Sequence, residues 1–174
     1  MSTTVKEPEQ REFTPAPEGL HQAVCADVWP IWTEPRPEEW GGGLQDKTML
    51  VWHIDEINPT DGKPYAVFKR YTASLHEKAT LRHDLESWRG RKFSPEELKS
   101  FDLERLIGVN CQIQVLHKAG KNGKVYANAV SIVPAGKNQQ KLVVAKDYER
   151  KKDRKPDTPN AEPMEDESGD RVPF

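Results

Sequence analysis

The chain has 174 residues, of which 35% are hydrophobic and 31% are charged. This composition supports one modest hydrophobic core with polar flanks and excludes a core that runs the whole length. No apolar stretch approaches the roughly 20 residues that a membrane-spanning helix needs. The first ten residues lack the basic and apolar regions of a signal peptide. We therefore expect an intracellular protein with no membrane partner.

The net charge of −2 hides three blocks of opposite sign. Residues 1–62 carry 4 basic and 12 acidic side chains, residues 63–155 carry 21 and 10, and residues 156–174 carry 1 and 6. A basic middle favours a polyanionic partner, and an acidic end is typical of an interaction tail. The alternative is a normally mixed surface followed by a solubilising tail.

Alternation of apolar and polar residues predicts three strands in the first half of the chain. Residues 1–18 are polar and proline-rich, so we expect a loose arm. Pro30 indicates an edge or a bulge in the first strand. Residues 33–46 contain two prolines and three consecutive glycines, which predicts a loop. The three expected strands cover residues 20–32, 47–57 and 64–74.

The hydrophobic period changes to a helical one after the third strand. Two capping-box spacings, at residues 74–77 and 94–97, predict the starts of a longer and a shorter helix. The longer helix carries Leu81, Leu85 and Trp88 on one face, and Gly90 is expected to end it. The alternating pattern then returns, which predicts two more strands over residues 107–117 and 125–133 with a hairpin turn at Asn122-Gly123.

Five strands with a helix between the third and the fourth is the layout of the OB-fold, a partly open Greek-key barrel. We therefore expect an all-β protein with a five-stranded OB-fold barrel and that helix. Its segments would be a flexible N-terminal arm (1–18), an OB-fold domain (19–145), and a disordered C-terminal tail with an acidic tip (146–174).

The sequence offers no set of residues for catalysis or for metal binding. The five histidines lack zinc-ligand spacing, and no Ser/His/Asp or Cys/His combination stands out. Cys25 and Cys111 lie in apolar runs and are expected to be buried free thiols. We therefore expect a protein that is no enzyme and needs no cofactor.

Aromatic and basic residues are interleaved in several parts of the chain. Single-stranded nucleic acid needs a basic groove for its phosphates and flat rings for its bases. The candidate DNA-binding residues are Trp29, Trp32, Trp40, Phe68, Lys69, Arg70, Tyr71, Trp88, Arg89, Arg91, Lys92, Lys118, Lys121, Lys124 and Tyr126.

Core packing competes with base stacking as the role of each aromatic residue. Trp52 aligns with other apolar residues of its strand, which favours the core. Successive strand residues point to opposite faces, so Arg70 should share a face with Phe68 while Lys69 points away. Trp40 has no obvious core to join and is the best candidate for stacking or for partner binding.

The last residues form the most specific pattern in the chain. An acidic run leads to Val172-Pro173-Phe174 and a free terminal carboxylate, which suits capture by a basic pocket with an apolar floor. This tip resembles that of bacterial and phage single-stranded DNA-binding proteins (SSB), matching at Asp170, Val172, Pro173 and Phe174. Arg171 departs from the pattern, which usually has an acid there. The block over residues 71–117 also resembles small proteins of phage replication and recombination modules.

The resemblance to SSB implies an OB-fold that binds single-stranded DNA with little sequence preference during replication, recombination or repair. It also implies that the tip (Asp170, Val172, Pro173 and Phe174) recruits replication and recombination proteins. Such a protein would lie in the cytoplasm of a bacterium or of a phage-infected host, associated with DNA. An RNA-binding OB module and a replisome adaptor that binds no DNA are the alternatives, and a homo-oligomeric state stays open.

Overall fold

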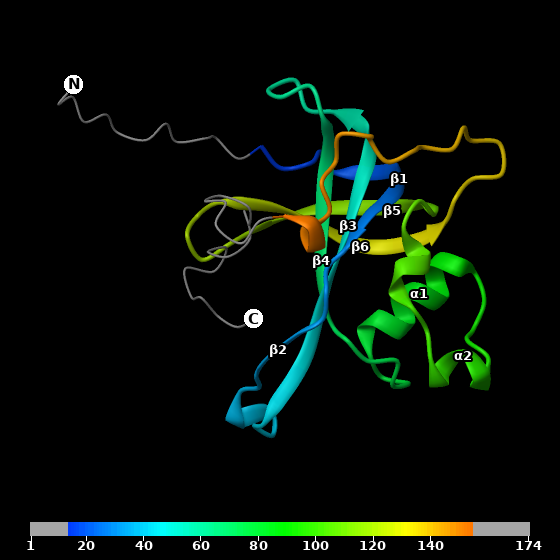
Figure 1. Ribbon diagram of the computed structural model, residues 1–174. Helices are drawn as coiled ribbons and strands as arrows, with labels where there is room; N and C mark the ends of the chain where they lie inside the picture. The colour runs from blue at the N-terminus through cyan, green and yellow to red at the C-terminus, as the bar shows by residue number, and fades with distance from the viewer. Residues whose placement is uncertain (1–13, 155–174) are drawn as a thin grey trace.

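A computed structural model describes residues 14–154, which form one antiparallel sheet and two helices, the first of which packs against the sheet (Figure 1). The strands are β1 (Gly19–Val28), β2 (Trp32–Pro35), β3 (Leu44–Ile57), β4 (Pro64–Thr72), β5 (Asn110–Ala119) and β6 (Val125–Pro134). The helices are α1 (Thr80–Arg89) and α2 (Pro95–Lys99). Short 3-10 helices lie at Glu38–Trp40, Leu103–Leu106 and Lys151–Asp153.

Hydrogen bonding orders the sheet β4-β3-β1-β5-β6, and β2 pairs with the first residues of β3 beyond the end of β1. The expected succession of strands, helix and strands is confirmed, but the sheet has six strands rather than five. The first expected strand is split because Pro30 has no N–H to continue the ladder. Within residues 14–154, the end strands β4 and β6 share no ladder, so the sheet is open.

β2 and the start of β3 form a projecting hairpin where the sequence predicted a loop. The pairing runs from Trp32 opposite Lys47 to Pro35 opposite Leu44. Gly41, Gly42 and Gly43 all have positive φ angles, between 64° and 104°, which only glycine adopts without strain. These glycines confine the turn to a few residues, so the loop prediction is wrong for the flanks that pair. We call this hairpin the β2–β3 arm.

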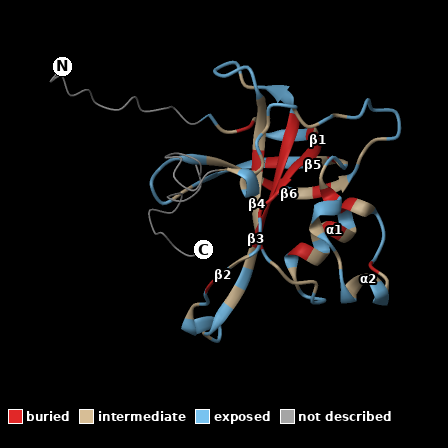
Figure 2. Cartoon of the chain, in the orientation of Figure 1, coloured by how far each residue is buried: buried red, intermediate tan, exposed pale blue. Residues whose placement is uncertain are grey.

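The main core lies between the inner face of the sheet and α1 (Figure 2). Trp52 is fully buried, and its ring lies 5.9 Å from that of Trp88 on α1. The prediction that Trp52 belongs to the core is confirmed. Cys25 and Cys111 are buried free thiols, as expected. Burial raises the pKa of the Cys25 thiol to about 12, so it has no tendency to act as a thiolate.

One of the two expected capping boxes is present. Ser94 accepts a hydrogen bond from Glu97 N while Glu97 caps the Ser94 N–H, which starts α2. The other is wrong, because α1 begins at Thr80 and its N-cap is Ala79 without a side-chain bond. Ser74 instead accepts from His76 N in a local turn. Gly90 ends α1 with φ 73°, as expected.

The segment after β6 folds back over the outer face, which is the sheet face opposite α1 (Figure 1). We call residues 136–154 the C-terminal strap. Asn110 holds it at Leu142 by bonds to both the backbone N–H (2.8 Å) and the carbonyl (2.9 Å). The ring of Tyr148 lies edge-on to His53 at 4.9 Å. Residues 146–154, which the sequence assigned to a disordered tail, are thus packed against the sheet.

The N-terminal arm is likewise anchored over its last residues. The rings of His21 and His117 lie 2.7 Å from the carbonyl oxygens of Pro17 and Ala16, and Ala16 is buried. The folded part of the chain therefore extends beyond both expected boundaries, 19 and 145. Among the described residues, no helix has the length and apolar character needed to cross a membrane.

Candidate nucleic-acid interface

The outer face carries a small aromatic cluster of its own. Trp29, Met49 and Val51 are buried together there, and Trp32, Ala66 and Phe68 pack against them. The rings of Trp29 and Trp32 lie 6.2 Å apart. These side chains come from β2, β3 and β4 and, for Trp29, from the interruption between β1 and β2. Strand alternation places them opposite the main core, so they form a second apolar surface.

Cations lie over the two tryptophans of this cluster. The Arg70 guanidinium is 5.1 Å from the centre of the Trp32 ring, and the Lys151 ammonium is 4.6 Å from that of Trp29. Arg70 shares this face with Phe68, as the strand alternation predicted. Cation and ring together form the type of surface on which bases stack and phosphates bind.

Lys47 belongs to this surface, although the sequence did not single it out. Its Nζ donates a hydrogen bond to Thr72 Oγ1 at 2.9 Å, and it pairs opposite Trp32 in the β2–β3 arm. Burial lowers the pKa of Lys47, partly opposed by the carboxylate of Glu34. The sequence predicted a loop over residues 33–46, so it did not reveal that Lys47 lies opposite Trp32. Only the pairing of β2 with β3 in the structure shows this.

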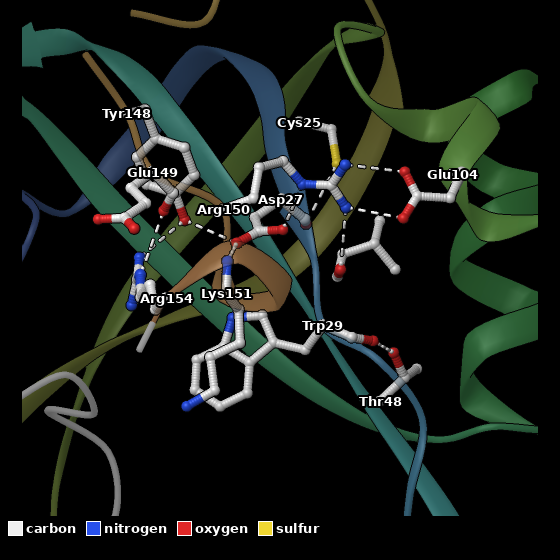
Figure 3. Close-up of polar contacts among 11 residues, drawn as sticks. Cys25, Asp27, Trp29, Thr48, Glu104, Tyr148, Glu149, Arg150, Lys151 and Arg154 are labelled. Carbon is white, nitrogen blue, oxygen red and sulfur yellow. Dashed lines mark hydrogen bonds and ion pairs between the residues drawn. The ribbon is translucent and has the colours of Figure 1, made fainter. Parts of the chain in front are cut away.

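A buried carboxylate fastens the C-terminal strap beside the cluster (Figure 3). Asp27 is fully buried and accepts hydrogen bonds from Tyr148 Oη (2.9 Å), Arg150 Nε (2.8 Å) and Lys151 N (2.8 Å). Arg150 also pairs with Glu104, and these two carboxylates raise its pKa. Burial, reinforced by Asp27, raises the pKa of Tyr148. In the sequence, Asp27 is marked only as an acid within an apolar strand, so this role was not predicted.

Three of the candidate residues point to the inner side instead. Lys69 Nζ and Tyr71 Oη both bind one carboxylate oxygen of Asp84 on α1, at 2.7 Å and 2.6 Å. Tyr71 and Trp88 are buried in the main core, where Trp88 Nε1 donates to the Asn110 carbonyl. Their rings are therefore not available for stacking in this structure.

The basic residues at the end of α1 lie on the helical side of the molecule. Arg89 pairs with Glu97 at 2.7 Å and covers the Phe93 ring at 4.6 Å. Arg91 and Lys92 are exposed in the turn that follows. α1 packs on the inner face of the sheet, so these three cations are not part of the outer-face surface.

Two hairpins project from the sheet and carry the remaining candidates (Figure 1). Trp40 lies at the tip of the β2–β3 arm and is 63% exposed, as expected for a ring with no core to join. The β5–β6 hairpin turns at Gly123, which has φ 78°, so the expected turn is confirmed. Its exposed lysines and its half-buried tyrosine are Lys118, Lys121, Lys124 and Tyr126.

The proposed partner-binding tip, Asp170 with Val172, Pro173 and Phe174, lies outside the described residues. Among residues 14–154, no cluster of three or more His, Cys, Asp or Glu side chains could hold a metal ion. In comparisons with known proteins, no family model matches this chain and no curated protein matches its sequence.

Proposed function

We propose that the protein binds single-stranded DNA along the outer face of its sheet. The observation that carries this proposal is the outer-face cluster, in which the partly buried rings of Trp32 and Phe68 lie with Lys47 and Arg70 and pack against the buried Trp29. Stacking of one base on an aromatic ring contributes about 1–3 kcal/mol, and cations beside the rings supply the sequence-independent attraction for phosphates.

We infer in addition that the sheet is an OB-type barrel. If β1 and β2 count as one interrupted strand, β1 pairs with β3 and β5, β4 flanks β3, and β6 flanks β5. A helix between β4 and β5 completes the order of a five-stranded Greek-key barrel. Such barrels bind oligonucleotides on the face of their middle strands and with the two flanking hairpins. The β2–β3 arm and the β5–β6 hairpin have these positions in the chain.

The proposed DNA path therefore runs over the outer face and is flanked by Trp40 on one hairpin and by Lys118, Lys121 and Lys124 on the other. Recruitment of replication and recombination proteins by the acidic tip is a further part of the proposal. It is supported only by the sequence of residues 165–174, whose acidic run and final Val-Pro-Phe would suit a basic pocket with an apolar floor on a partner.

The test is the salt dependence of binding to a labelled oligo-dT. We expect log Kd to vary linearly with log salt, with a slope of roughly 0.7 per neutralised phosphate. Lys47→Gln, which keeps a hydrogen-bond donor but removes the charge, should lower that slope by about 0.7 and weaken binding. Lys78→Gln in the β4–α1 connection is the matched control and should leave the slope unchanged.

Absence of binding to oligo-dT at low salt would overturn the proposal in favour of the adaptor alternative. Competition by an oligo-U of equal length tests the other alternative. If the RNA displaces the labelled DNA at a lower concentration than unlabelled oligo-dT does, RNA is the preferred polymer.

A further inference from the structure

Besides Asp27, a second buried acid lies on the outer face. Glu34 on β2 is 7% exposed and lies between Trp32 and Arg70. Its Oε2 accepts hydrogen bonds from Trp32 Nε1 (3.0 Å) and from Arg70 Nη2. Its other oxygen, Oε1, is buried without a hydrogen-bond partner. The carboxylate therefore has an unused acceptor beside the two side chains that the proposed function uses most.

A structural role explains only half of this arrangement. Holding Trp32 and Arg70 in place uses Oε2 alone, whereas burying Oε1 without a hydrogen-bond partner destabilises the fold. A negative charge on a face that binds a polyanion also weakens that binding. The unpartnered oxygen and the negative charge are both unfavourable, and the bonds made by Oε2 account for neither. The arrangement therefore indicates a ligand that donates hydrogen bonds to the Glu34 carboxylate.

The position of Arg70 shows where such a ligand would lie. Its guanidinium covers the Trp32 ring at 5.1 Å, where a stacked base would lie. A base that stacks on Trp32 would displace the Arg70 guanidinium. The displaced guanidinium could then bind a phosphate of the same DNA strand, because arginine pairs with phosphate through two parallel hydrogen bonds. The Glu34 carboxylate then faces the edge of the base that is stacked on Trp32.

We propose, on the basis of the proposed function, that Glu34 makes this position a guanine-preferring subsite. Guanine presents two adjacent donors, N1–H and the N2 amino group, to the two oxygens of a carboxylate. Thymine offers one donor between two carbonyl acceptors, and cytosine offers an amino group beside an acceptor nitrogen. An ionised carboxylate accepts only, so guanine is the base with the best match.

The experiment compares three oligonucleotides of about twelve nucleotides, within the site size typical of one OB-fold. The first is oligo-dT, the second has deoxyguanosine at every third position, and the third has deoxyinosine there. Deoxyguanosine and deoxyinosine differ only in the N2 amino group of the base. All three oligonucleotides carry the same number of phosphates. The wild-type protein should bind the guanine oligonucleotide about fivefold or more tightly than the inosine one.

Glu34→Gln should bind the guanine and inosine oligonucleotides about equally and should bind oligo-dT more tightly than the wild type. Glu77→Gln, an exposed acid in the β4–α1 connection, loses the same charge and should keep the guanine preference. Circular dichroism melting establishes that each variant is folded, and the guanine–inosine comparison in the wild type needs no variant at all.

Equal binding of the three oligonucleotides by the wild type would overturn the guanine subsite and leave DNA binding intact. Binding of none of them would overturn the proposed function, and the subsite with it. An increase in affinity for Glu34→Gln that is the same for all three oligonucleotides would reduce Glu34 to an electrostatic role.

Discussion

The two faces of β4 carry similar side chains in different surroundings. On the inner face, Lys69 and Tyr71 converge on Asp84 of α1. The lysine charge is thereby paired, and the tyrosine hydroxyl has its hydrogen-bond partner within the fold. On the outer face, Arg70 and Phe68 lie beside Trp32, with one buried carboxylate and a strap of irregular chain as neighbours. Within residues 14–154 no α-helix covers this side, and the 3-10 helix Lys151–Asp153 belongs to the strap.

The comparison shows that residue type alone does not identify a binding residue. Alternating residues of one strand reach a core packed by a helix and an outer face that only the strap partly covers, and the layer above each face decides what a cation or a ring does there. The inner face stabilises the protein, whereas we propose that the outer face binds DNA. Substitutions on the two faces should therefore separate stability from affinity.

The largest expected effect comes from the inner face. Trp52→Ala removes a fully buried ring that contacts Trp88, and we expect it to lower the free energy of unfolding by about 3–5 kcal/mol. Urea denaturation followed by circular dichroism measures this loss. Trp32→Ala on the outer face is the comparison and should cost far less stability. Equal losses would mean that the outer cluster is a second structural core.

A smaller effect is expected where the C-terminal strap meets the outer face. Asp27→Asn removes the charge that binds Arg150, and its amide group cannot satisfy all three donors that the carboxylate accepts. We expect the strap to open more readily by about 1–3 kcal/mol. Hydrogen exchange of residues 146–154 should accelerate accordingly.

Glu104→Gln is the matched control for the strap, because Glu104 binds the same arginine from a position that is 47% exposed. Its effect on hydrogen exchange should be smaller than that of Asp27→Asn. Unchanged exchange in Asp27→Asn would contradict the view that the buried carboxylate fastens the strap.

The next effect tests affinity on the outer face. Trp32→Ala should weaken binding to oligo-dT by about 1 kcal/mol, or roughly fivefold in Kd, because one stacking surface is lost. Trp32→Phe keeps a flat ring and should retain most of the affinity. Fluorescence anisotropy with a labelled oligonucleotide distinguishes the two. Identical affinities for both variants and the wild type would exclude Trp32 from the DNA path.

The sequence predicted the elements that depend on local pattern. The alternation of β5 and β6, the Ser94 capping box and the shared face of Phe68 and Arg70 all follow from neighbouring residues. The features it missed depend on contacts between distant segments. Nothing near Lys47 or Glu34 in sequence predicts a paired arm, because three glycines suggested a loop.

The strap was missed for a related reason. Residues 146–154 are mostly charged, and charge favours disorder when only the local composition is considered. Their packing depends on Asp27, more than 100 residues earlier, and a single buried acid in an apolar strand does not reveal its partners. The candidate site was therefore predictable in its residue types and in one strand face, but not in its extent.

The smallest expected effect lies on the helical side and concerns pH. The Ser94 N–H and the Arg89 guanidinium lower the pKa of Glu97 from 4.5 to about 2. A carboxylate whose pKa is depressed by folding stabilises the protein above pH 4.5, and this contribution is lost as the pH falls toward 2. Glu97→Gln should therefore lower the urea midpoint slightly at pH 7. The difference from the wild type should shrink as the pH falls from 4.5 toward 2.

Glu96→Gln, on the same turn of α2 but outside the capping box, is the control and should change the urea midpoint by less than Glu97→Gln at pH 7. Parallel pH curves for the two variants would contradict the role assigned to Glu97.

Glu97→Gln also tests the comparison of the two faces, because it releases Arg89 from the Glu97 carboxylate. If its affinity for oligo-dT rises above that of Glu96→Gln, the helical side contributes to DNA binding and the outer face is only part of the interface.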